Sequence, residues 1–421
     1  MQRNNLLNCL VTAWITLTAI SGCAVKTEAP ATQPIEKPAE NVSINNAQTA
    51  RNINYLAAAD LPRFNKLISA FDKMITDGLH QGAQLAVYKN GDPILIIAGG
   101  KDVRSGRPIN EKSLFSIRST TKALTALSMA ILYERGLFKY DDPVVKYWPE
   151  FGHNAKENIT IAHMMSHSAG IPQTPQVPVT SWTDREAVAR AIEDLKPIWV
   201  PGTKFGYHAT TYGWVADELA QRLACVNIAG LLQKELTGPL GIRDVYLGLP
   251  DSEYARFCTM EVLGKTAANR VALSEFLNTS QGLKLPLAWG AGVATAQDLA
   301  RLFNILAFEG TYGGRTFIKS NTQALMSKPL NPPGSEDVIL HWPVRWGLGF
   351  INGETPSIYG TGSHPQAIGH AGGGANVAWA DPQQHLSVAF LCNGMRTGGE
   401  EWERYRILGD LIYEAVSSMN N

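Results

Sequence analysis

The chain has 421 residues and equal numbers of basic and acidic side chains, 37 of each, so its formal net charge is zero. That balance gives no general electrostatic case for binding nucleic acid. A hydrophobic fraction of 45% and a charged fraction of 18% are typical of a globular protein that can bury a substantial core, in one large domain or two.

The first residues have the pattern of a bacterial export signal. Arg3 precedes a short apolar run over 6–20, which is too short to cross a membrane comfortably, and the run ends in Ile20-Ser21-Gly22-Cys23. Small residues before a cysteine resemble a lipobox, so we expect 1–22 to be removed and Cys23 to be lipidated; an ordinary secretory signal is the alternative. A lipid on Cys23 would anchor the protein without spanning the membrane, facing the periplasm or the cell exterior.

After the signal, residues 23–55 are rich in Pro, Ala, Thr, Glu and Asn and are interpreted as a disordered tether to a body over 56–421. Asn90-Gly91 between two apolar runs is a strong hairpin signal. Residues from about 145 to 285 read as a helical, loop-rich subdomain beside an α+β sheet. The predicted helices cover 61–79, 123–133, 159–165, 183–195, 211–223, 229–236, 295–308 and 402–415, and the predicted strands 84–88, 93–98, 346–351, 375–380 and 387–391.

One predicted helix is apolar on every side from Ala123 to Tyr133, which indicates that it is buried, and Gly136 marks its end. Lys122 stands near its start, with no further charged residue until Glu134, although lysines are almost never buried without a partner or a function. Ser119 lies one helical turn earlier on the same face, so a hydroxyl faces a desolvated amine. This arrangement is that of a nucleophile beside a base. The structural alternative is a helix-capping serine with a snorkelling lysine.

Two other stretches accompany Ser119-x-x-Lys122. They are Tyr207-His208-Ala209 and the Gly-rich run His370-Ala371-Gly372-Gly373-Gly374, with Trp289-Gly290-Ala291-Gly292 between them. In this order they resemble the penicillin-recognising serine hydrolases, which include class C β-lactamases, D,D-peptidases and related carboxylesterases, over roughly 60–418. The resemblance implies a β-lactamase/transpeptidase-like α+β fold, an antiparallel sheet flanked by helices with a helical subdomain.

The resemblance also implies roles for particular residues. Ser119 would be the acylated nucleophile, Lys122 its partner base, and Tyr207 the tyrosine that passes a proton to the leaving group. Which of Lys122 and Tyr207 is the base in acylation is left open. The oxyanion hole would consist of the backbone amides of Ser119 and Gly373. His208, next to the tyrosine, is interpreted as structural.

The sequence departs from the β-lactamase pattern at two positions. Ala209 stands where β-lactamases have an asparagine that binds the side-chain amide of a β-lactam, and His370 where they often have a lysine that recognises its carboxylate. Both changes remove recognition groups and keep the acylating residues, as in the esterase branch. We therefore expect hydrolysis of small or medium acyl esters through an acyl-enzyme on Ser119. His370 and Gly372 would lie on the substrate-binding strand, and Trp289 is the best candidate for an acyl pocket.

Two other functions stay open: a weak β-lactamase or D-amino-acid peptidase acting on cell-wall-related substrates, and a lipoprotein that only binds a ligand or partner. No cofactor is expected, because dinucleotide and P-loop fingerprints are absent from the sequence. No metal is expected either, since His163 and His167 lack a third ligand. A bridge between Cys225 and Cys258 is not decided by the sequence, and Cys392 reads as a buried thiol.

Overall fold

The computed structural model describes residues 51–54, 56, 60–264, 268–356, 358–374, 376–396, 399–417 and 419. The predicted signal over 1–22, with Cys23, and most of the predicted tether lie outside these residues. The end of the tether was placed too late, because Arg51–Asn54 forms strand β1 and pairs antiparallel with β3 (Asp92–Gly100). An edge strand offers unpaired backbone groups to any extended segment, so a polar composition does not exclude this pairing.

The centre of the fold is a seven-stranded antiparallel sheet with the strand order β1-β3-β2-β16-β15-β14-β13. Strand β2, from the N-terminal part of the chain, pairs with β16, from the C-terminal part, within this sheet. The predicted hairpin is confirmed: Asn90 and Gly91 have φ angles of 55° and 88°, which the tight turn between β2 and β3 requires. The remaining bounds are β2 (Gly82–Lys89), β13 (Ile351–Asn352), β14 (Ile368–Gly372), β15 (Asn376–Asp381) and β16 (Leu386–Cys392).

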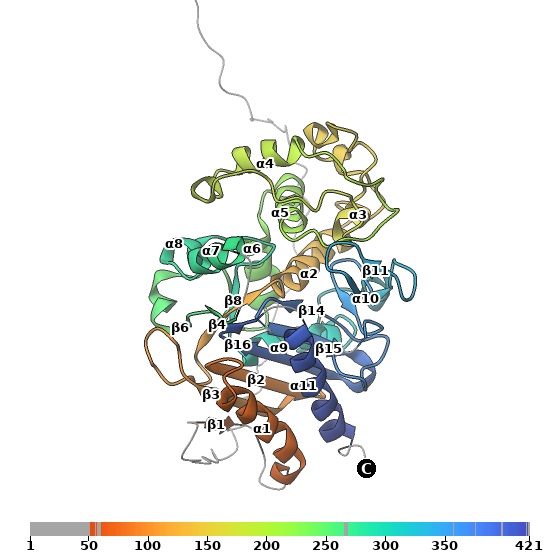
Figure 1. Cartoon of the computed structure of the whole chain (residues 1–421). Coiled ribbons are helices and arrows are strands. Elements are labelled where there is room, and N and C mark those ends of the chain that lie inside the picture. Colours follow the sequence, from red (N-terminus) through yellow and green to blue (C-terminus); the bar gives the residue numbers. More distant parts are fainter. Residues whose placement is uncertain are drawn as a thin grey trace, which may run out of the picture. The chain divides into compact units, whose positions relative to one another are not determined.

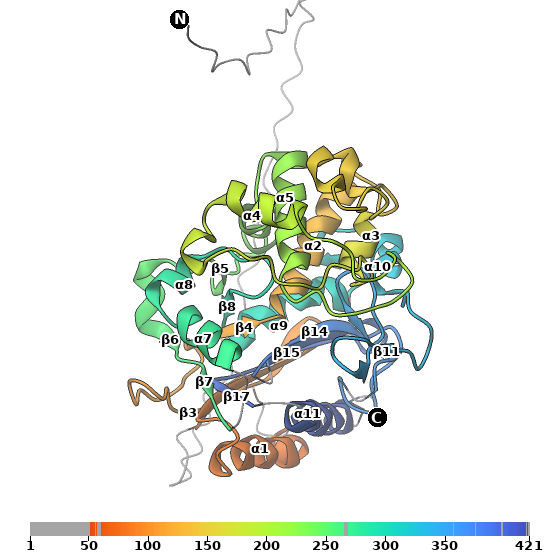
Figure 2. The same cartoon turned by 45° about the horizontal axis from the view of Figure 1, so that its top comes forward.

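Helices cover both faces of this sheet (Figures 1 and 2). On one face α1 (Leu61–Thr76) and α11 (Gly399–Ser417) lie side by side, as Figure 2 shows beneath the strands. On the other face lie α2 (Thr121–Glu134) and α9 (Ala296–Ala307). Strand β2 is buried on both sides, with alternate residues facing the two cores: Leu85 and Val87 pack toward α1 and α11, while Ala86 and Tyr88 pack toward α2 and α9.

The helical subdomain is present, above the sheet in Figure 1, but it is not purely helical. Its short strands β5 (Val245–Leu247) and β6 (Phe257–Cys258) join a second sheet of order β5-β8-β4-β6. Runs of two or three residues are too short to give a strand periodicity, so the sequence did not reveal them. The helices here are α3 (Ile161–Met165), α4 (Arg185–Glu193), α5 (Thr211–Ala224), α6 (Ile228–Leu231) with a π-helical turn (Leu232–Thr237), α7 (Ala268–Leu277) and α8 (Ser280–Lys284).

The strand predicted over 346–351 is wrong. These residues form a tight turn in which the amide of Gly347 donates to the carbonyl of Phe350 at 2.9 Å. Gly349 has a φ of 86°, and a Cβ there would lie 2.5 Å from Tyr212 Oη, so glycine is required where the turn meets α5. Other short elements are β4 (Leu114–Arg118), β7 (Glu261–Val262), β8 (Gly292–Ala294), β9 (Thr311–Tyr312), β10 (Arg315–Thr316), α10 (Ser320–Ser327), β11 (Glu336–Asp337), β12 (Trp342–Pro343) and β17 (Gly394–Met395).

The cysteines of the body are all free. Cys225 is exposed and Cys258 is buried, so the bridge between them that the sequence left open is not formed. Cys392 is a buried thiol at the end of β16, as predicted, and its Sγ donates to the carbonyl of Gly374 at 2.7 Å. Packing, hydrogen bonds and ion pairs such as Arg185–Glu218 therefore hold the described body together without a disulfide.

Candidate active site

Ser119 and Lys122 lie at the junction between β4 and α2. Ser119 occupies the turn after Arg118, whose φ is 49°, and its side chain is half-buried, whereas Lys122 is completely buried. The Nζ of Lys122 lies 3.4 Å from Ser119 Oγ and donates to the carbonyls of Ala209 at 2.8 Å and Trp289 at 2.7 Å. These partners are neutral, so burial lowers the pKa of Lys122 well below its usual value. The predicted pair is thus brought together, with an amine suited to accept a proton.

Tyr207 lies beside this pair, as predicted. The Nζ of Lys122 is 4.8 Å from the centre of its ring, and Trp346 stacks on the ring at 5.8 Å with 10° between the planes. The tyrosine is half-buried and comes from the loop before α5. Serine, lysine and tyrosine from two distant parts of the chain therefore meet at one point.

Asp337, which sequence reasoning missed, holds this tyrosine in place. Its buried Oδ1 accepts hydrogen bonds from the backbone amides of Tyr207 at 3.1 Å, Ile339 at 2.9 Å and Leu340 at 2.8 Å. Its Oδ2 accepts from the indole Nε1 of Trp346 at 2.9 Å, the same ring that stacks on the tyrosine. One carboxylate thus fixes both the backbone and the stacking partner of Tyr207. The only sequence signal was an acidic residue directly before the apolar run Val338-Ile339-Leu340.

The third motif places β14 against the nucleophile. A Cβ on Gly372 would overlap the carbonyl oxygen of Ile117 and lie 3.1 Å from the amide nitrogen of Ser119, so only glycine allows this approach. Gly373 comes next and is more open, with only Met395 Sδ near its own Cβ position, at 3.5 Å. Within the described residues, neither the Ser119 amide nor the Gly373 amide donates a hydrogen bond. The two amides are free to serve as the predicted oxyanion donors.

His370 is buried on β14, with 2% of its surface exposed. Its Nδ1 pairs with the carbonyl of Ala371 at 2.6 Å, and its Nε2 has no partner among the described residues. Burial first, and then the nearby Lys122, lower the pKa of His370 to about 3, so it is neutral near pH 7. It packs near Tyr207 and Trp346 and cannot supply the positive charge of the lysine that it replaces. A direct contact between His370 and a substrate stays a prediction.

Trp289 contributes its backbone carbonyl, which binds Lys122, rather than an evident pocket wall. Its indole is 5% exposed and packs edge-on against Trp182 and Trp214 at 5.7 and 5.8 Å. A cavity of about 280 Å³ lies on the other side of this aromatic cluster, lined by Trp148, Trp182, Trp214 and Ala288 among others, but not by Ser119 or Trp289. The role of Trp289 in an acyl pocket stays a prediction.

The histidines near the site are used in packing. His208 donates from Nδ1 to the carbonyl of Gly206 at 2.6 Å and accepts at Nε2 from the amide of Ile171 at 2.9 Å, which confirms its structural interpretation. Burial lowers the pKa of His208 to about 3, although its hydrogen bond to the Gly206 carbonyl acts in the opposite direction. The Nδ1 atoms of His163 and His167 accept separate backbone amides, at 3.2 and 3.1 Å.

Comparison with known proteins agrees with this site. The β-lactamase family model matches residues 67–410. The chain is 28% identical over 365 residues to a protein of Mycobacterium tuberculosis named esterase/beta-lactamase LipL, over 80% of this chain and 82% of that protein. Among solved structures it is similar to a family VIII carboxylesterase, with a TM-score of 0.76, and to a penicillin-binding protein homologue from Caulobacter crescentus, with a TM-score of 0.75. Each is 28% identical and covers 86% of this chain and 99% of the other.

The family match extends from α1 into α11 and includes all three residues of the serine–lysine–tyrosine cluster. It agrees with the predicted antiparallel sheet, flanking helices and helical subdomain. The chain belongs to the β-lactamase family.

Proposed function

We propose that the protein is a serine carboxylesterase that hydrolyses small to medium acyl esters through an acyl-enzyme on Ser119. The observation that carries this proposal is the position of the Ser119 hydroxyl, 3.4 Å from an amine whose pKa burial lowers well below its usual value. An amine with a lowered pKa at this distance can accept the proton of a hydroxyl and so activate it as a nucleophile. Relatives named esterase and carboxylesterase support the same chemistry.

The reaction follows from the geometry in two half-reactions. Ser119 Oγ attacks the ester carbonyl while its proton passes to the base, and the oxyanion forms beside the amides of Ser119 and Gly373. When the tetrahedral intermediate collapses, the C–O bond to the alcohol breaks and the alcohol leaves with a proton delivered through Tyr207. Water then attacks the acyl-enzyme by the reverse route, which releases the acid and regenerates Ser119. The relative parts of Lys122 and Tyr207 as base in acylation stay open.

Two positions favour esters over β-lactams. Ala209 offers a methyl group where the recognition amide would stand, and its carbonyl is already bound by Lys122. His370 is neutral, so no cation stands on β14 for a substrate carboxylate. The site keeps the groups that break an acyl bond and lacks two that would select a β-lactam. The family match and the penicillin-binding relative support cell-wall-related substrates as the second candidate.

The test is a series of p-nitrophenyl esters with increasing acyl length, assayed beside the β-lactam nitrocefin. We expect burst hydrolysis of the acetate or butyrate, lost in Ser119→Ala together with labelling by a fluorophosphonate. Ser128→Ala is the matched control, because Ser128 is a buried serine of α2, the helix that follows Ser119, and its hydroxyl donates to the carbonyl of Leu124. Nitrocefin turnover equal to ester turnover would favour the second candidate, and full activity of Ser119→Ala would refute the nucleophile.

We also propose that the protein is exported and held at the membrane by a lipid on Cys23. The support is the sequence Ile20-Ser21-Gly22-Cys23 after a short apolar run. None of the helices in the described part of the chain has the length and hydropathy needed to cross a membrane. Growth with a palmitate analogue should label the parent and not Cys23→Ser; equal labelling of both would contradict the anchor.

A further inference from the structure

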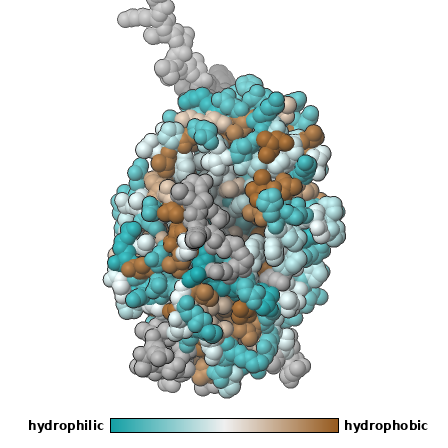
Figure 3. Space-filling model, in the orientation of Figure 1, coloured by the Kyte–Doolittle hydropathy of each residue, from teal (hydrophilic) through white to brown (hydrophobic). Residues whose placement is uncertain are grey.

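Exposed aliphatic side chains gather on two loops beside the active site. Seven large aliphatic residues are exposed in the described part of the chain, and five of them lie on the loops around 198–200 and 338–340. We call these five the apolar rim: Ile198, Val200, Val338, Ile339 and Leu340, which are 60%, 68%, 38%, 41% and 39% exposed. On the face drawn in Figure 3 the hydrophobic surface is divided into several patches separated by hydrophilic side chains.

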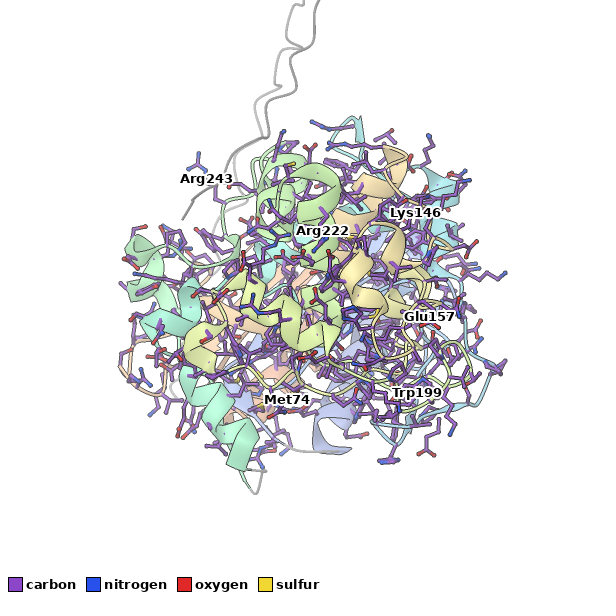
Figure 4. The ribbon with its side chains drawn as sticks, turned by 90° about the horizontal axis from the view of Figure 1, so that it is seen from above. Met74, Lys146, Glu157, Trp199, Arg222 and Arg243 are labelled. Atoms are coloured by element: carbon purple, nitrogen blue, oxygen red, sulfur yellow. The ribbon has the colours of Figure 1, made fainter. Side chains whose placement is uncertain are left out.

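The two loops form one surface. The amide of Val338 donates to the carbonyl of Phe205 at 2.9 Å. A Cβ placed on Gly206 would lie 2.7 to 2.9 Å from Trp199, Val338 and Ile339 side-chain atoms, so side chains of both loops converge on this glycine. Figure 4 shows Trp199 near the edge of the molecule, on the loop between α4 and α5. Residues nearly 140 apart in the sequence therefore make one continuous apolar rim.

The rim is connected directly to the catalytic tyrosine. Gly206 precedes Tyr207, and the Asp337 oxygen that binds the Tyr207 amide also binds the amides of Ile339 and Leu340. The other loop is fixed by hydrogen bonds from Ile198 N to Gly170 O at 2.8 Å and from Trp199 Nε1 to Ser168 O at 3.3 Å. These bonds hold the aliphatic groups outward without a cover from the rest of the described chain. The rim is thus joined through Asp337 and Gly206 to the tyrosine whose ring lies 4.8 Å from Lys122 Nζ.

Lysines flank the 198–200 loop of the rim, and Glu336 beside the 338–340 loop pairs with His341 at 3.2 Å. Lys196 and Lys204 are exposed on either side of the 198–200 loop, and neither forms an ion pair within the described residues. Protruding aliphatic groups with unpaired lysines beside them are the combination that binds the surface of an anionic bilayer, since the aliphatics enter the acyl region and the lysines meet the headgroups. A protein partner or a second copy would use the apolar groups without needing these cations.

We propose that the apolar rim docks the active site onto a lipid surface containing anionic headgroups, so that esters held in that surface reach Ser119. The inference rests on the proposed esterase function and narrows its substrates to esters of a lipid bilayer or aggregate. Docking would place the ester next to Tyr207, so that its acyl chain would not have to cross water to reach the site. The rim then selects substrates by their physical state, while Ser119, Lys122 and Tyr207 supply the chemistry.

The first experiment measures binding to vesicles of phosphatidylcholine with and without phosphatidylglycerol, by sedimentation. The parent is the full chain with Cys23→Ser, and every variant carries the same change, so that a lipid at Cys23 plays no part. We expect Val200→Ser/Ile339→Ser to bind phosphatidylglycerol-containing vesicles at least tenfold more weakly. Lys196→Gln/Lys204→Gln should weaken that binding by about fivefold for each lysine and leave binding to pure phosphatidylcholine nearly unchanged.

Leu325→Ser is the matched control, because Leu325 is 38% exposed on α10 outside the rim. Equal vesicle binding by parent and rim variant would overturn the inference. So would a change from dimer to monomer in the rim variant, seen by light scattering without lipid, if vesicle binding stayed the same, because the rim would then be a contact between copies.

A second measurement separates this inference from the proposed function. It is the ratio of the rate on a long-chain ester dispersed in vesicles to the rate on soluble p-nitrophenyl acetate. The rim variant should lower this ratio at least tenfold, and an unchanged ratio would contradict docking of the substrate surface. If the parent hydrolyses neither ester, the proposed function fails, whereas vesicle binding still decides whether the rim meets lipid.

Discussion

Two lysines in the described part of the chain are completely buried, and only one of them lies beside a serine hydroxyl and a tyrosine ring. Lys122 at the start of α2 binds the carbonyls of Ala209 and Trp289, and Lys156, in the loop before α3, binds the carbonyls of His153, Glu193 and Leu195 at 2.6 to 2.7 Å. Both are held by backbone oxygens, and burial lowers the pKa of both, that of Lys156 to about 8.

The difference lies in what surrounds the amines. The carboxylates of Asp194 and Glu193 partly offset the effect of burial on Lys156, whose hydrogen bonds join the 153–156 loop to the end of α4. Lys122 has no such compensation, and a serine hydroxyl and a tyrosine ring lie next to it. A buried lysine is therefore not a catalytic signal by itself; the hydroxyl groups at its side make it one.

The largest expected effect separates the two lysines by activity. Lys122→Met should lower kcat/KM for p-nitrophenyl acetate by about 10³-fold, because the proton acceptor for Ser119 is lost. Lys156→Met should stay within about twofold of the parent per folded molecule. The measurement is steady-state kinetics, with circular dichroism to confirm folding. Similar losses of kcat/KM in both variants would show that the two buried lysines do not differ in their importance for catalysis.

A second prediction tests whether Tyr207 needs its support beside Lys122. Asp337→Asn keeps an oxygen for the backbone amides but presents an NH₂ group to the Trp346 indole, so kcat should fall about tenfold with KM nearly unchanged. Asp337→Ala leaves four donors without an acceptor, and we expect a larger loss of kcat and a lower Tm. If both variants lose only stability, Asp337 is structural and does not position the tyrosine.

The third prediction concerns the stability that Lys156 provides. Lys156→Met leaves three buried carbonyls without their donor and should lower the free energy of unfolding by about 2 kcal/mol. Urea denaturation at pH 7 measures this change, with Lys146→Met as the control because that lysine is exposed and pairs only with Asp142 on the surface. An unchanged midpoint for Lys156→Met would mean that its hydrogen bonds only offset the cost of burying the amine.

The last prediction is a pH dependence. The folded pKa of Lys156 is about 8 and its ordinary value is 10.5, so between these values the unfolded chain holds a proton that the folded chain has lost. Stability due to this group therefore rises with pH across that interval. The difference in free energy of unfolding between the parent and Lys156→Met should grow in favour of the parent from pH 8 to pH 10. A constant difference would contradict the lowered pKa.

Much of the scaffold was predictable because it depends on local patterns. Apolar residues at helical spacing indicated α1, α9 and α11, and Asn90-Gly91 indicated the hairpin between β2 and β3. The strand expected over 346–351 was wrong because its apolar residues alternate with glycines that let the chain turn against α5. The apolar pattern over 346–351 predicted burial correctly but predicted the wrong secondary structure.

The sequence by itself determined the candidate reacting groups. A serine one turn before a lysine on an all-apolar helix, followed by a tyrosine and a glycine-rich strand, identified Ser119, Lys122 and Tyr207. Ser119 and Lys122 could be paired because they are one helical turn apart. Tyr207 could be assigned because the motifs follow each other in the same order as in the family.

Only the tertiary structure decided how those groups are held. The carbonyls that bind Lys122 belong to Ala209 and Trp289, and a backbone oxygen has no sequence signature. Asp337 reaches Tyr207 from 130 residues away, and the apolar rim exists only because two distant loops meet at Gly206. Positioning depends on contacts between segments far apart in the chain, and such contacts are fixed by packing rather than by any local pattern of residues.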